Sequence, residues 1–135
     1  MVRVINRNGF TLIEVMIALV IATLTLGAYI GANVLIQKNT EVLNERTLAL
    51  QDANRAIEQI RTASRTTSPA FPANVVAAYP NNSTIAGSGG LTSESILINY
   101  ADPTANPLVV TVGVTWTSYA RRTTTVAVQT YITQR

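Results

Sequence analysis

The chain opens with an apolar segment that is long enough to cross a membrane. Residues 10–36 carry a single charge, that of Glu14, among aliphatic, small and aromatic side chains. As a helix these 27 residues would measure about 40 Å, against roughly 30 Å for the hydrocarbon layer of a bilayer. The pattern predicts one transmembrane helix near the N-terminus.

The pattern then becomes amphipathic. Between residues 37 and 67 apolar positions recur at spacings of three, four and seven, with charged residues largely on the other side of the helical wheel. No proline occurs before Pro69, so the helix should continue from the membrane segment and end near residues 62–67. The predicted apolar stripe consists of Leu43, Leu50, Ala53, Ile57 and Ile60.

Residues 68–94 break this periodicity with prolines, glycines and small polar residues. We predict a variable loop here, with one short strand at Val75–Tyr79. A connection of this length often carries function.

The last part of the chain, residues 95–135, has the two-residue alternation of β-strands. Strands are predicted at 95–100, 108–117 and 126–132, with a hairpin loop at 118–122. Trp116 continues an apolar row that should face the core. The expected fold class is α+β, with a long N-terminal helix whose first half is transmembrane and a C-terminal antiparallel β-sheet packed on its second half.

Composition argues against catalysis and against a nucleic-acid-binding body. The net charge is +3 and falls to +1 for a chain beginning at Phe10, because Arg3 and Arg7 precede the apolar segment. Cysteine and histidine are absent, and Glu94 and Asp102 are the only acids beyond the long helix. No nucleophile or acid–base pair can be nominated, so we expect no enzyme, no cofactor and no metal. A calcium site at those two acids is the weaker alternative.

Charges that flank the apolar segment predict its orientation. Residues 1–9 contain two arginines and no acid, whereas the residues after Ile36 carry both signs. The positive-inside rule then places the N-terminus in the cytoplasm and the rest of the chain on the exported side. An ordinary signal peptide cleaved near Ala28 or Ala32 is the alternative on pattern alone.

Glu14 needs a reason to lie in this segment, because a carboxylate within a transmembrane helix costs about 2.5–3.5 kcal/mol on insertion scales. It is expected to serve a partner, although a carboxylate reaching the headgroups is the simpler alternative. Further along, Gly27 and Gly31 form a small-xxx-small pair. Close helix packing, bending and no special role all remain open for these glycines.

The stretch Gly9-Phe10-Thr11-Leu12-Ile13-Glu14-Val15 resembles the prepilin signal of type IV pilins and of the pseudopilins of type II secretion. This resemblance implies that a prepilin peptidase removes residues 1–9 by cutting between Gly9 and Phe10, and that the new Phe10 amine is N-methylated. It also implies that residues 10–36 assemble with other subunits, with Glu14 pairing to the N-terminus of a neighbour.

A weaker resemblance covers residues 110–130, which are similar to the C-terminal hairpin of minor pilins of the V class and minor pseudopilins of the I class. The absence of cysteine and of an acidic calcium loop also favours a minor subunit. The resemblance implies an exported filament subunit that contacts an inner-membrane assembly platform and ends in a periplasmic or cell-surface filament. A pilus, a competence pilus, where nucleic acid is a possible partner, and a pseudopilus all remain open. The alternative function is a membrane-anchored binding, adhesion or DNA-uptake module that does not polymerise.

Overall fold

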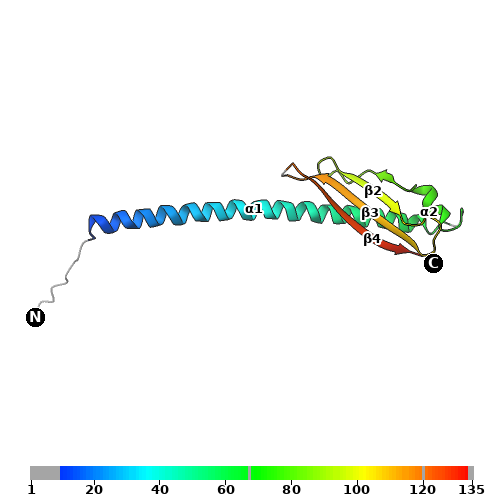
Figure 1. The fold of residues 1–135 in the computed structure, drawn as a ribbon, viewed down its shortest axis with the longest axis horizontal. Helices are drawn as coiled ribbons and strands as arrows, with labels where there is room; N and C mark the ends of the chain where they lie inside the picture. Colours follow the sequence, from blue (N-terminus) through cyan, green and yellow to red (C-terminus); the bar gives the residue numbers. More distant parts are fainter. Residues whose placement is uncertain (1–9, 67, 120, 134–135) are drawn as a thin grey trace, which may run out of the picture. The chain divides into compact units, whose positions relative to one another are not determined.

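The computed structural model describes residues 10–66, 68–119 and 121–133 (Figure 1). They divide into two units, Met1–Asn39 and Thr40–Arg135, and the helix α1 contributes residues to both. The second unit, which we call the head, contains the sheet. In chain order the elements are α1 (Leu12–Ala63), α2 (Ala73–Ala78), β1 (Ser83–Ile85), β2 (Ser95–Tyr100), β3 (Leu108–Thr117) and β4 (Thr123–Ile132).

The head contains a four-stranded antiparallel sheet in the order β1-β2-β3-β4, so every strand pairs with its neighbour in sequence. The predicted α+β class is therefore confirmed. The bounds of β2 and β3 agree with the prediction, whereas β4 begins at Thr123, three residues earlier than the apolar alternation indicated. Those residues pair with the end of β3, where Thr117 lies opposite Thr123.

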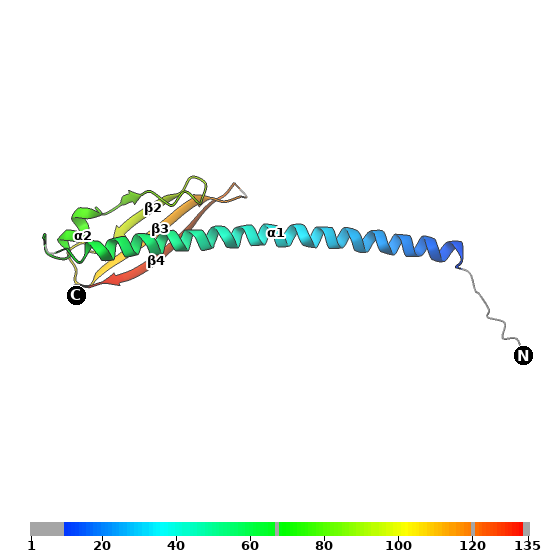
Figure 2. The same ribbon diagram turned by 180° about the vertical axis from the view of Figure 1, so that it is seen from behind.

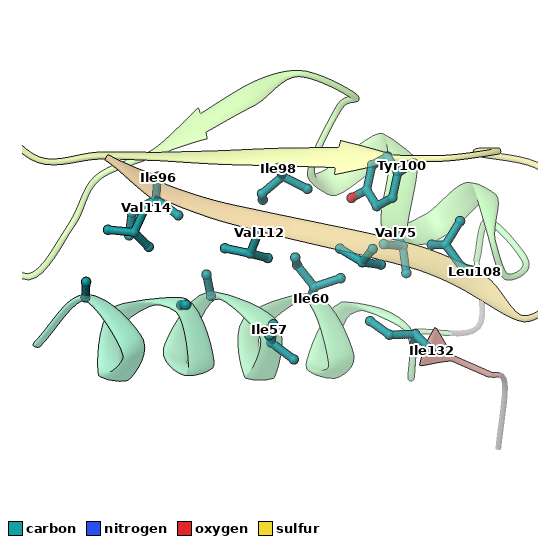
Figure 3. Close-up of a cluster of buried hydrophobic side chains, with 14 of the residues drawn as sticks. Ile57, Ile60, Val75, Ile96, Ile98, Tyr100, Leu108, Val112, Val114 and Ile132 are labelled. Atoms are coloured by element: carbon teal, nitrogen blue, oxygen red, sulfur yellow. The ribbon is translucent and has the colours of Figure 1, made fainter. Parts of the chain in front are cut away.

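One face of the sheet packs on the part of α1 that lies in the head (Figures 2 and 3). The alternate residues of β3, from Leu108 to Trp116, are all buried, as the two-residue period requires. Figure 3 shows Ile60 of α1 pointing toward the sheet, beside Val112. The helix contributes Ala49, Ala53, Ala56, Ile57 and Ile60 to this core.

The predicted stripe on α1 was only partly right. Leu43 and Leu50 are 61% and 42% exposed, whereas Ala49 and Ala53 are fully buried. The sheet covers the helix face centred on these alanines, whose small side chains let the backbones approach closely. Ile57 and Ile60 are buried as predicted, whereas Leu43 and Leu50 lie outside the contact, which hydrophobic periodicity alone could not show.

The predicted strand at Val75–Tyr79 was wrong, because most of this segment belongs to α2 (Ala73–Ala78). Two adjacent residues, Asn74 and Val75, are both buried, which a helical turn allows and a strand with alternating faces does not. Part of the predicted loop is also β1, which pairs with β2. The short helix is held by a contact with the end of α1.

Asn74 makes that contact. Its side-chain amide nitrogen donates to the carbonyl oxygens of Ala63, Ser64 and Thr66 at 3.1, 3.2 and 2.8 Å. Ala63 is the last residue of α1, and Ser64 and Thr66 lie in the turn that follows, so the two N–H groups of the amide are shared among carbonyls at and just after the end of the helix. Asn74 thereby joins α2 to the end of α1.

Replacing Asn74 by alanine should lower the free energy of unfolding of the head by about 2 kcal/mol, because buried carbonyls would lose their donor. The measurement is denaturant unfolding of the full chain in detergent micelles, followed by Trp116 fluorescence. Asn54→Ala, at an exposed position of α1, is the matched control. Equal stability of the two variants would contradict the role given to Asn74.

Candidate processing and assembly segment

The first turn of α1 is closed by contacts between Thr11 and Glu14. The backbone N–H and the hydroxyl of Thr11 both donate to Oε2 of Glu14, at 2.8 and 2.9 Å. The backbone N–H of Glu14 reaches the Thr11 hydroxyl oxygen at 3.4 Å. Because Leu12 is the first residue of the helix, Thr11 is the N-cap and Glu14 is the third helical residue. This is a capping box.

The capping box gives Glu14 a local partner that sequence reasoning missed, although the Thr-x-x-Glu spacing is its known signature. A carboxylate in the first turn also faces the positive end of the helix dipole. The side chain of Phe10 is 88% exposed, and Gly9 lies outside the described residues. A new amine at Phe10 would therefore form one residue before the cap that orients Glu14.

The apolar part of α1 has its polar side chains satisfied within the helix. The hydroxyl of Thr23 donates to the Val20 carbonyl at 2.9 Å, and the hydroxyl of Thr25 donates to the Ala22 carbonyl at the same distance. The side-chain amide of Asn33 donates to the Tyr29 carbonyl, also at 2.9 Å. Such bonds reduce the cost of placing polar groups in lipid, where water cannot serve as partner.

The same segment exposes its apolar surface. Large side chains from Leu12 to Ile36 are exposed, and α1 is long and apolar enough to span a membrane. At Gly27 and Gly31 an added Cβ would meet no heavy atom within 4 Å. The backbone is thus open to a neighbour at both glycines, but the structure does not bring them against any other element.

Comparison with known protein families adds one finding. Residues 5–30 match the prokaryotic N-terminal methylation motif. The motif supports a type IV pilin-like protein. It covers Gly9, Phe10, Glu14 and Gly27, and it implies processing by prepilin peptidase and assembly with other pilin subunits. The motif and the apolar helix together fit a membrane-anchored precursor of a structural protein. Comparisons with curated proteins and with solved structures gave no match.

In the head, the contact that sequence reasoning missed is made by Glu45. Its carboxylate accepts hydrogen bonds from Trp116 Nε1 at 3.1 Å, from the Ser118 hydroxyl at 2.5 Å and from the Tyr119 backbone N–H at 2.8 Å. Burial disfavours the charged form, but the three hydrogen bonds outweigh it and lower the pKa of Glu45. Glu45 thus ties the β3–β4 hairpin to α1, and Trp116, 1% exposed, is confirmed as a core residue.

The two acids considered for calcium do not come together. Glu94 immediately precedes β2, while Asp102 follows it and accepts hydrogen bonds from the backbone and hydroxyl of Thr104 at 2.9 and 2.7 Å. Those two bonds, the hydroxyl's first, lower the pKa of Asp102. Within the part of the chain that the structure describes, no group of three or more histidine, cysteine or acidic residues is placed to hold a metal.

Proposed function

We propose that this protein is an exported structural subunit, a minor pilin or minor pseudopilin, of a type IV pilus or a type II secretion filament. The observation that carries the proposal is the start of α1: a methylation motif, a capped Glu14 and an exposed apolar helix occur in one segment. A soluble globular enzyme does not need an exposed apolar helix, whereas a subunit that moves from the membrane into a bundle of helices packs through one.

Processing is the first step of the proposed mechanism. Prepilin peptidase removes residues 1–9, which carry Arg3 and Arg7, and keeps the apolar helix. The cut converts the Phe10 nitrogen from an amide into an ammonium group, which is then methylated and stays cationic. The protein is a substrate of this enzyme and has no catalytic role of its own.

Assembly follows from the charges that processing creates. Phe10 now carries a cation at the edge of an apolar helix, and Glu14 carries an anion one turn away. Two helices that are offset along their axes can pair the Glu14 of one with the Phe10 amine of the other. An unpaired charge in a bundle without water is costly, so the arrangement of subunits that pairs the two charges is the most stable one. Close approach at Gly27 and Gly31 would then bring neighbouring backbones together.

The rest of the chain takes its place around this helix. Residues 10–36 form the transmembrane and assembly helix, the remainder of α1 continues it to Ala63, and β1 to β4 form the sheet of the exported head. The precursor is oriented with its N-terminus in the cytoplasm, where it meets the inner-membrane assembly platform. Residues 68–94 supply the surface most free to vary among related subunits.

The mass of the mature protein tests the processing step. In a strain with active prepilin peptidase, the chain should begin at Phe10 and carry one additional methyl group on its amine. In a matched strain without the peptidase it should keep Met1 or the residue after it. A terminus near residue 30, or an uncleaved chain in the first strain, would refute the proposal.

The location of the mature protein separates filament subunit from membrane-anchored binding module. Sheared filaments from cells with all assembly partners should contain the mature chain. If it were found only in the membrane fraction, although correctly processed, the binding module would be favoured.

A further inference from the structure

The loop before β2 packs on α1 through a pair of acids. Asp52 of α1 is 5% exposed and accepts a hydrogen bond at 2.7 Å from the hydroxyl of Ser88. Next to it, Gly90 lies against Leu48, since a methyl group at Gly90 would be 3.6 Å from Leu48 Cδ1. Residues 87–94, which we call the glycine loop, thus cover this side of the helix.

Glu94 ends the glycine loop and turns its carboxyl group inward. Both carboxyl oxygens are buried, and no well-formed hydrogen bond reaches either of them among the described residues. They lie directly against Gly87, where an added Cβ would overlap the carboxyl group. The backbone therefore leaves room for this carboxyl group, and the backbone of Gly89 acts on it as a weak donor.

No cation among the charged groups around Glu94 pairs with its carboxyl group in the described structure. Asp52 is the acid that acts on it, by charge and by hydrogen bonding. Arg55, one turn after Asp52, lines an open cleft with Tyr79, and no ion pair joins Arg55 to either acid in the described structure. Glu45, two turns before Asp52, is engaged by the β3–β4 hairpin. Two neighbouring carboxylates without a cation repel each other, whereas one proton turns one of them into a donor for the other.

We propose that Asp52 and Glu94 share one proton, and that this proton holds the glycine loop on α1 so that the loop is released as the pH rises. The inference does not depend on filament assembly. Release of the glycine loop would change the surface of the head according to the pH of the compartment that the head faces.

The electrostatics act in the direction that the proposal requires. Burial, then the hydrogen bond with Asp52 and its negative charge, raise the pKa of Glu94 above its ordinary value and outweigh the opposing effect of the Gly89 backbone. The docked loop therefore binds more protons than the released loop between the ordinary glutamate pKa and the raised one. Docking is strongest below this window and weakens as the pH rises through it.

Hydrogen exchange of the full chain in detergent micelles tests this. Exchange of the glycine-loop amides is compared between wild type and Glu94→Gln at the same pH, which cancels the intrinsic effect of pH on exchange. Glutamine is neutral and can donate to Asp52, so it stands in for the protonated acid. At about pH 5 we expect the glycine-loop amides of wild type and Glu94→Gln to exchange equally fast. At about pH 8 those of wild type should exchange faster, by about tenfold for each unit by which docking of the loop raises the pKa of Glu94.

Controls keep the outcome decisive. Asp102→Asn removes an exposed carboxylate beyond the other end of β2 and should leave glycine-loop exchange as in wild type. Should Glu94→Gln fail to fold, Asp52→Asn and the carboxyl NMR titration of Glu94 in wild type provide the same test. A wild-type to variant ratio that is the same at both pH values overturns the proposal. A bound cation is the competing explanation. If Ca²⁺ or Mg²⁺ slows exchange in wild type, EDTA reverses the effect and Glu94→Gln does not show it, the proposal of a shared proton is overturned.

Discussion

Replacing Glu14 by alanine should leave the protein inserted and cleaved but remove it from filaments. The change deletes the anion and leaves the Phe10 ammonium of the neighbour unpaired, which costs about 3–5 kcal/mol when the pair is buried. Such a loss is enough to lower incorporation by at least about a hundredfold. The measurement is the amount of mature chain in sheared filaments relative to the membrane fraction.

Glutamine at the same position separates two roles of Glu14. The structure shows the carboxylate in a capping box with Thr11, and glutamine can also close such a box. Glu14→Gln should therefore keep the start of the helix but still fail to assemble, because it lacks the charge. Normal assembly of Glu14→Gln would assign the importance of this position to the cap, and normal assembly of Glu14→Ala would exclude both roles.

The second large effect is expected at Glu45. Replacing it by alanine should lower the free energy of unfolding of the head by about 3 kcal/mol, because the buried Trp116 indole and Ser118 hydroxyl would each lose an ionised acceptor. Thermal or denaturant unfolding of the full chain in micelles, followed by Trp116 fluorescence, measures the loss. Glu41→Ala, at an exposed position one turn earlier, is the control. Unfolding of Glu45→Ala at the same midpoint as this control would contradict the assignment.

The pH dependence gives a further check on Glu45. Its pKa is lowered in the folded head, so its contribution is present above the ordinary glutamate pKa and is lost as the pH falls through the lowered value. Glu45→Gln should therefore reduce the loss of stability on the acidic side. This sign is opposite to that expected for Glu94, whose docked form is favoured by acid.

The strongly periodic parts of the fold were predictable. In β3 the alternation of apolar and polar residues gave both the bounds and the buried face, because every second residue of the strand belongs to the core. The long helix was equally clear, since no breaker occurs before its end at Ala63. The charge of Glu14 in an apolar segment singled out this residue, and residues 5–30 match the N-terminal methylation motif, whereas the pairing role of Glu14 stays a prediction.

The rest depended on contacts between residues far apart in sequence. The α2 segment is short, and its helical form reflects the burial of Asn74 against the end of α1. No local pattern shows that Glu45 lies beside Trp116, because the two are 71 positions apart. The partnership of Asp52 and Glu94 was hidden for the same reason, and periodicity placed Asp52 on the polar side of the helix. Local patterns identify elements, whereas these polar contacts depend on how the elements pack.

The order of the strands has a consequence for how the head is made. Because each strand pairs with the one before it in sequence, a chain that emerges N-terminus first can build the sheet one strand at a time, without inserting a late strand between earlier ones. Pairing between sequence neighbours keeps loop-closure costs low and favours rapid folding. The contacts of Glu45 with Ser118 and Tyr119 span 73 and 74 positions and must form after the sheet has reached its last hairpin. Folding of a chain that emerges in this order would thus end with the last hairpin, when its contacts with the helix form.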